Sequence, residues 1–242
     1  MMGRLLNWPN GLGVRTRRPL SGPRSVGGTS PQDSIGGRSQ SVASPFGAWK
    51  YEFVLPVAEG RLYRRIEGLI TALHGGANAV RVPWPAPDAL TLNEAGAKYA
   101  YVQERDGMPW DNVMPWANQR NWSASPPNVP VAANASVGAT IIRLTADFWG
   151  YDLDMGDEIG FFPLHFGKYM ITEARGSGEY RIWPPLRKAI TTDDFATLKP
   201  VLAMKLDGEQ AAELSRGVGY GEETTLILSE VFDYDVRDYF TV

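Results

Sequence analysis

Two local patterns of apolar residues dominate the first third of the chain. Apolar side chains at 49, 51, 53 and 55 alternate with the charged residues Lys50 and Glu52, and this period of two predicts a half-buried β-strand over 49–55. From 59 to 73 the apolar positions follow helical spacing instead, and Gly75 and Gly76 supply a C-terminal stop. We therefore predict one amphipathic helix, followed by a short strand over 79–82.

The second half of the chain predicts strands rather than helices. Residues 168–173 and 179–183 are expected to pair as a hairpin across the Arg-Gly-Ser-Gly turn at 175–178. The 26 Gly and 18 Pro of the chain also favour many short strands and turns. Together these features predict a mainly β fold in which 59–73 is the only long helix. The other strand-like segments are 139–148, 157–162, 200–206 and 224–232.

A rigid corner follows the predicted hairpin. Neither Pro184 nor Pro185 can donate to a strand ladder, so the strand that ends at Trp183 must stop there. Trp183 and Leu186 flank the prolines and place large apolar groups on this stiff segment. We interpret the corner as scaffold and expect Trp183 to be a buried aromatic residue, whose truncation would cost ~3–5 kcal/mol of stability.

Residues 84–137 form a Trp- and Pro-rich excursion. A plain loop seldom exceeds ~15 residues, so we expect a hairpin or a docking surface here, with 99–102 as the best strand candidate. The plainer interpretation is that the aromatic rings pin an irregular segment to its own or a neighbouring subunit. Exposed Trp110 and Trp116 could instead stack on sugars, which keeps carbohydrate binding open as an alternative.

Charge is distributed as a gradient along the chain. Residues 1–40 carry six arginines against one acid, a net of +5, whereas 207–242 carry nine acids against two arginines, a net of −7. The basic arm lacks interleaved aromatics and a lysine cluster, and the whole chain has a net charge of −3, so specific nucleic-acid binding is not expected. We expect arm and tail to meet, within one subunit or between neighbours. The candidate interface residues of the arm are Arg15, Arg17, Arg18, Arg24 and Arg38.

Candidate catalytic residues are sparse. The chain has no cysteine, and its two histidines, His74 and His165, lie far apart in the sequence, so thiolate and paired-histidine chemistry is not expected. A group of acids around Gly156 is the nearest approach to a glycosidase pair, but Asp and Gly at this spacing are equally typical of a solvated turn. We predict no enzymatic activity, cofactor or metal. The acids concerned are Asp152, Asp154, Asp157 and Glu158.

The sequence also predicts no membrane insertion. No apolar run approaches the ~18 residues of a membrane helix. The first ten residues lack the apolar middle of a signal peptide. We therefore expect a protein that is made in a cytoplasm and leaves it only by lysis.

Several short motifs follow one another along nearly the whole chain. They are LLNWP at 5–9, GGRS at 36–39, Trp49 in its strand, GGAN at 75–78 with VRVP at 80–83, IWPPL at 182–186 and FATLKP at 195–200. With these motifs the chain resembles the minor tail structural proteins of long-tailed, non-contractile bacteriophages, and within that group it is most similar to distal tail proteins, which join the tail tube to the tip or baseplate. The match is weakest over 84–137.

The resemblance implies a ring-forming β-sandwich domain with one helix and a second, small β-barrel-like domain. On this chain the ring domain would comprise 1–83 and 207–242, and the small domain 138–206. The implied function is that of a structural virion protein at the tail tip, present in the host cytoplasm during assembly. Residues 10–45, which hold five of the six arginines of the basic arm, would be extended and ordered against an adjacent subunit.

The resemblance also implies partners. The protein would form a homo-oligomeric ring, with six subunits favoured and three as the alternative. It would contact tail tube, tape measure and tail hub proteins. A carbohydrate-binding tail adhesin that recognises the host surface is the alternative function, and a glycan hydrolase stands last.

Overall fold

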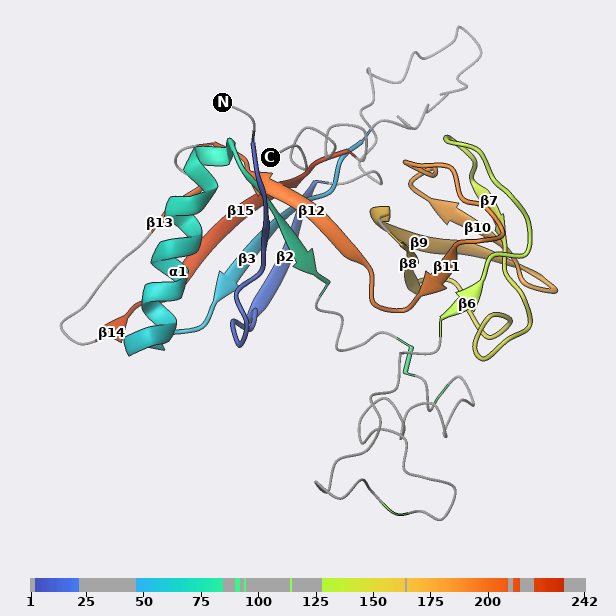
Figure 1. Cartoon of the computed structure of the whole chain (residues 1–242), viewed down its shortest axis with the longest axis horizontal. Coiled ribbons are helices and arrows are strands. Elements are labelled where there is room, and N and C mark those ends of the chain that lie inside the picture. Colours follow the sequence, from blue (N-terminus) through green and yellow to red (C-terminus); the bar gives the residue numbers. More distant parts are fainter. Residues whose placement is uncertain are drawn as a thin grey trace, which may run out of the picture.

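The computed structural model describes residues 3–21, 47–84, 90–91, 94, 114, 128–163, 165–208, 211–213 and 220–232. These residues form two large β-sheets that lie side by side along the longest axis of the molecule, with one α-helix at the outer end of the first sheet (Figure 1). The predicted mainly β fold with one long helix is confirmed for the described part of the chain.

The first sheet is built from both ends of the chain. Its strand order is β1-β5-β12-β15-β3-β2, and β13 pairs with β15 beyond this path. The β1/β5 pair is parallel and the other pairs are antiparallel. The strands are β1 (Leu5–Asn7), β2 (Thr16–Ser21), β3 (Lys50–Leu55), β5 (Ala79–Pro83), β12 (Val201–Leu206), β13 (Ala212–Glu213) and β15 (Thr224–Glu230).

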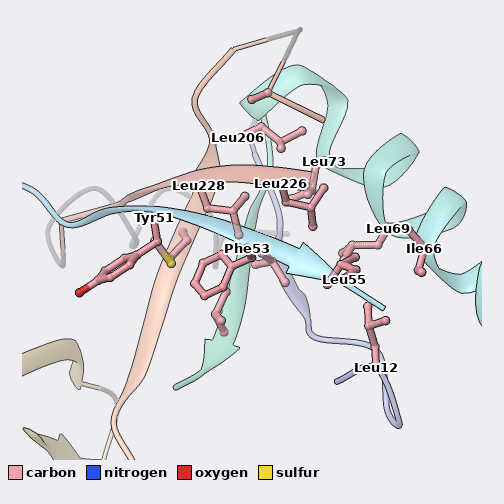
Figure 2. Close-up of a cluster of buried hydrophobic side chains, with 14 of the residues drawn as sticks. Leu12, Tyr51, Phe53, Leu55, Ile66, Leu69, Leu73, Leu206, Leu226 and Leu228 are labelled. Atoms are coloured by element: carbon pink, nitrogen blue, oxygen red, sulfur yellow. The ribbon is translucent and has the colours of Figure 1, made fainter. Parts of the chain in front are cut away.

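Helix α1 (Gly60–Leu73) covers one face of this sheet. The predicted alternation in β3 is confirmed, because Tyr51, Phe53 and Leu55 are buried while the residues between them are partly exposed. Figure 2 shows side chains of β3, β15 and α1 meeting in one apolar cluster. The helix contributes Ile66, Leu69 and Leu73, which share one face as the helical spacing predicts. A two-stranded ribbon of β4 (Ala58–Glu59) and β14 (Tyr220–Gly221) adjoins the start of the helix.

The glycines after α1 give a direct test of this packing. Gly76 has a φ of +100°, and a Cβ placed there would lie 2.5 Å from the carbonyl oxygen of Leu206 in β12. We expect Gly76→Ala to lower the free energy of unfolding by about 1–3 kcal/mol, because it combines an unfavourable φ with a backbone clash. Urea unfolding measures the change.

Gly68→Ala is the matched control. Gly68 lies in the exposed face of α1 with open space around it, and its replacement should stabilise the subunit by up to ~1 kcal/mol. Equal effects at the two positions would contradict this account of the contact with β12.

The second sheet curls into a small barrel. Its strand order is β6-β11-β8-β9-β10-β7, and its edges are joined by hydrogen bonds from Ala132 N to Arg143 O (2.8 Å) and from Thr145 N to Pro130 O (3.1 Å). The hairpin of β9 and β10 confirms the one predicted from the sequence. The strands are β6 (Val129–Pro130), β7 (Ile141–Arg143), β8 (Glu158–Phe162), β9 (His165–Gly176), β10 (Glu179–Trp183) and β11 (Phe195–Thr197).

Two expected boundaries are wrong. Strand β12 was expected in the small domain over 138–206, but it pairs with β5 and β15 and is a central strand of the first sheet. Strand β6 lies within the expected excursion, 84–137, yet it pairs with β11 in the second sheet. The physical reason is that strand pairing is non-local, and the apolar run of 200–206, interrupted only by Lys205, fits either sheet. The strand candidate at 99–102 lies outside the described residues.

The corner after β10 is confirmed as a stop, but its anchor is a different residue. Strand β10 ends at Trp183. The Trp183 side chain is only half-buried, whereas Pro184, Pro185 and Leu186 are buried. The backbone of Leu186 exchanges hydrogen bonds with Gly138 and Ala139. The expectation of a buried Trp183 is therefore wrong, and Leu186 fixes the corner in the barrel core.

The basic arm is also partly different from expectation. Residues 10–45 were expected to be ordered only by contact with an adjacent subunit. Residues 16–21 are instead ordered within their own subunit, because they form the edge strand β2, which pairs with β3. Leu12, just before β2, is buried in the first core. Arg24 and Arg38 lie outside the described residues.

Candidate functional site at the junction of the two sheets

The two sheets meet where β12 and β9 lie side by side. The indole Nε1 of Trp49, next to β3, donates a hydrogen bond to the backbone oxygen of Lys168 in β9 at 3.1 Å. Phe166, also in β9, packs with Ala79 and Ala203 of the first sheet. A Cβ at Gly160 in β8 would lie 2.8 Å from the Cα of Pro200, so the barrel backbone approaches the start of β12 closely. The junction is therefore a packed interface.

A buried lysine lies at the centre of this junction. The side chain of Lys168 is 1% exposed, and its ammonium group lies 2.7 Å from Oε1 of Glu158 in β8. The same ammonium group lies 4.2 Å from the ring centroids of both Trp49 and Trp84, and 5.3 Å from that of Tyr51. A buried ammonium group is unfavourable unless paired, and here a carboxylate and three aromatic faces replace its water.

The carboxylate of Glu158 links the barrel to two further groups of the first sheet. Its Oε2 accepts a hydrogen bond from the indole Nε1 of Trp84. It also lies 3.7 Å from the guanidinium of Arg17 in β2, whose Cζ stands 4.8 Å from the Trp84 ring centroid. The ion pair therefore joins β8 and β9 of the barrel to β2 and to residues that flank β3 and β5.

A second polar cluster lies beside the rigid corner. Directly after that corner, Arg187 donates a hydrogen bond to the backbone oxygen of Gly47 and lies 3.7 Å from Oε2 of Glu230 in β15. The same Oε2 accepts a hydrogen bond from Trp49 N at 2.9 Å. Burial raises the pKa of Glu230, and the nearby Arg187 partly offsets that rise. The corner thus places a barrel arginine against the first sheet.

His165 belongs to the packing of the barrel. Its Nε2 lies 2.6 Å from the hydroxyl oxygen of Tyr169, and that hydroxyl accepts a hydrogen bond from Arg187 N at 2.9 Å. The Tyr169 hydroxyl therefore links the imidazole of His165 to the backbone that follows the rigid corner. Burial lowers the pKa of His165 to about 4, and the positive charge of Lys188 acts in the same direction. His165 is thus a neutral structural residue.

The acidic residues around Gly156 do not converge on one site. Asp157 accepts a hydrogen bond from Asp154 N at 2.7 Å, as in a turn, and burial raises the pKa of Asp157. Glu158 instead points into the junction with Lys168. Within the described part of the chain, no group of three or more His, Asp or Glu residues is placed to hold a metal ion.

The candidate arm residues take different positions. Arg15 forms an ion pair with Glu223, so arm and acidic tail meet within one subunit at this point. Arg17 belongs to the junction, and Arg18 is exposed on the edge strand β2. The meeting of arm and tail was one of two expected arrangements, and this contact is the intramolecular one.

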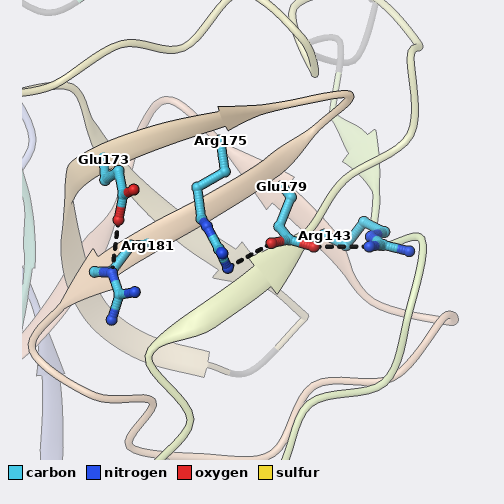
Figure 3. Close-up of polar contacts among 5 residues, drawn as sticks. All are labelled: Arg143, Glu173, Arg175, Glu179 and Arg181. Carbon is cyan, nitrogen blue, oxygen red and sulfur yellow. Dashed lines mark hydrogen bonds and ion pairs between the residues drawn. The ribbon is translucent and has the colours of Figure 1, made fainter.

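The exposed ion pairs of the barrel differ from the junction. Figure 3 shows five charged residues on β7 and the β9–β10 hairpin that pair among themselves: Arg143, Glu173, Arg175, Glu179 and Arg181. The hydrogen bond from Arg143 lowers the pKa of Glu179. Such solvent-exposed pairs contribute little stability. We therefore expect the buried Lys168–Glu158 pair to affect the free energy of unfolding more than these surface pairs do.

Little in the sequence indicates this junction. Lys168 and Glu158 fall in predicted strands, but a charged residue in a strand is usually on the solvent face. Their aromatic partners are 74 or more residues away in the sequence. One signal was available, because a lysine within the apolar stretch 165–171 is atypical of a strand in a barrel core.

No family model and no curated protein matches the sequence. No helix in the described part of the chain is long and apolar enough to cross a membrane.

Proposed function

We propose that the protein is a structural subunit of a bacteriophage tail, which forms a ring at the distal end of the tail and joins the tail tube to the tip or baseplate hub. The single observation that carries this proposal is the topology. The N- and C-terminal parts of the chain share one sheet with one helix, and a small β-barrel is inserted between them. This is the arrangement that the sequence resemblance implies for distal tail proteins.

The junction is consistent with a mechanical role. Lys168 and Glu158 pair within the barrel and contact Trp49 and Trp84, which flank strands of the first sheet. Arg187 of the barrel lies 3.7 Å from Glu230 of β15. A connector between tube and hub has to transmit force between its two domains without changing their angle. A desolvated ion pair enclosed by aromatic rings is directional and costly to break, so it suits that task.

No observation favours the carbohydrate-binding adhesin over the ring subunit. Trp110 and Trp116, the candidate sugar-stacking residues, lie outside the described residues. Trp84, which begins the Trp-rich segment, has its ring against Lys168 and Arg17. Glycan binding therefore stays a prediction for the excursion alone.

Immunogold electron microscopy tests the proposal. Antibodies against the purified protein would be applied to tails from an induced lysate of the bacterium that carries the gene. The proposal predicts gold particles at one end of each tail, the end opposite the capsid. Labelling along the tube, or tails that contain no peptide of this protein by mass spectrometry, would contradict it.

A further inference from the structure

A loop of the barrel presents acidic and apolar side chains together. This segment, 145–157, connects β7 to β8 and is called the acidic loop below. Trp149 and Leu153 anchor it in the barrel core, and the Tyr180 hydroxyl donates a hydrogen bond to the Gly150 oxygen at 3.1 Å. The exposed acidic and large apolar side chains between and beside these anchors are Asp147, Phe148, Tyr151, Asp152, Asp154 and Met155.

Phe148 is the most unusual residue of this loop. Its side chain is 57% exposed, and its φ is +48°, a conformation that bulky residues rarely adopt. Neighbouring contacts enforce this backbone: Gly150 N donates to Asp147 O at 2.9 Å, and a Cβ at Gly150 would lie 2.0 Å from Thr145 O. A strained backbone that holds a large apolar ring in water gives the isolated subunit no advantage.

The opposite end of the molecule carries a matching surface. Helix α1 lies at the far end of the first sheet from the barrel (Figure 1). Its exposed face, called the basic stripe, is formed by Arg61, Arg64, Arg65, Gly68 and Thr71. Glu67, which is partly exposed, borders that face one turn from Arg64. Arg65 donates a hydrogen bond to Asn10 O at 2.8 Å, and among the described residues Arg61 and Arg64 have no acidic partner.

Gly68 is a second local anomaly, at the centre of the basic stripe. A glycine in a helix interior costs ~1 kcal/mol relative to alanine. Its φ is not positive, and nothing lies within 4 Å of a Cβ built on it, so nothing within the described subunit requires a glycine. The missing side chain leaves a shallow gap between arginines, which fits the close approach of an apolar group from outside.

The geometry points to a head-to-tail contact between two copies of this chain, in which the acidic loop of one copy docks on the basic stripe of the next. Charge complementarity identifies the occupant. In the described part of the chain, Asp152 and Asp154 have no basic partner, and Arg61 and Arg64 have no acidic one. By contrast, the charges of the β9–β10 hairpin are matched within the subunit (Figure 3).

This arrangement produces a ring only if the subunit is rigid. The two surfaces lie at opposite ends of the subunit, so each copy uses a different surface toward each of its two neighbours. Such a heterologous contact adds subunits one after another and closes into a ring when the rotation between neighbouring subunits allows it. The Lys168 junction fixes the angle between the sheets and thereby the rotation per subunit. The inference rests on the proposed ring, and it names the surfaces that would form it.

Charge reversal tests the contact in the full chain. Arg64→Glu and Asp152→Lys should each weaken self-association about 10-fold or more in sedimentation velocity, because each brings like charges together at the interface. The chain that carries both changes should regain most of the wild-type association. Asp193→Lys, an exposed acid on another barrel loop, is the matched control and should associate like the wild type.

Two variants separate assembly from folding. Phe148→Gly relieves the positive φ and Gly68→Gln improves helix propensity, so both should keep or raise the thermal midpoint of the subunit. Both should nevertheless lose association about 10-fold or more, because one removes the apolar anchor and the other fills its gap.

Each outcome bears on the inference. Reduced association in the single variants with recovery in the double charge swap would support it. A wild-type ring that all these variants leave intact would overturn the docking surfaces but not the ring. A closed two-fold dimer would overturn the head-to-tail geometry. A wild-type chain that stays monomeric at every concentration would overturn the contact and the proposed ring together.

Discussion

Lys168→Met is expected to lower the free energy of unfolding by about 3–5 kcal/mol, the cost of breaking a buried ion pair from one side. Methionine retains the apolar stem but not the ammonium group that lies 2.7 Å from Glu158 and 4.2 Å from two indole rings. Glu158 is then left as a largely buried carboxylate, with Trp84 and Arg17 as partners. Urea unfolding at neutral pH measures the loss.

A matched variant and a double mutant distinguish this cause from the loss of any lysine. Lys205→Met removes an exposed lysine from β12 and should change stability by less than ~0.5 kcal/mol. Glu158→Gln in the Lys168→Met background should recover part of the loss, because the unpaired charge is gone. Equal effects of the two lysine variants would contradict a stabilising junction.

The contribution of His165 to the stability of the subunit should be lost as the pH falls from 6.5 to 4. Its pKa in the folded state is lowered to about 4, from an ordinary value of 6.5. Across this window the unfolded chain binds a proton that the folded chain does not, so stability rises with pH and is lost as pH falls. A difference of 2.5 pH units corresponds to about 3 kcal/mol.

The His165→Gln variant isolates this contribution. Glutamine keeps a polar group beside Tyr169 but does not titrate, so the pH dependence of its unfolding free energy should be shallower than that of the wild type by about 3 kcal/mol over the window. His74→Gln, at the exposed end of α1, controls for the loss of one imidazole. If His165→Gln and wild type lose stability in parallel on acidification, His165 is not held neutral by the fold.

Local elements were predictable from the sequence because their signals are local. The alternation of β3, the apolar face of α1 and the turn of the β9–β10 hairpin each depend on neighbouring residues. The placement of β12 depends instead on which partners it finds. Its Leu202, Ala203 and Met204 are buried in succession, so no alternation along the strand assigns one face to one sheet. Non-local pairing is the step that a single sequence specifies least.

The candidate site could be predicted only in part. Arg15 and Arg17 were identified as interface residues, and their contacts with Glu223 and Glu158 follow from charge. Their partners lie in the same subunit, and that choice depends on the edge position of β2. Lys168 was missed because burial of an ammonium group depends on residues brought from β8, β3 and the end of β5, which no local pattern records.

The central claim is that rigid two-sheet subunits build a ring at the distal end of a tail. Electron cryomicroscopy of tails from an induced lysate tests it most directly. The account predicts repeated density around the tail axis at the tip that fits both sheets in the relation fixed by Lys168 and Glu158, with α1 of each subunit against residues 145–157 of the next. Tip density that has no place for this two-sheet unit would contradict the account.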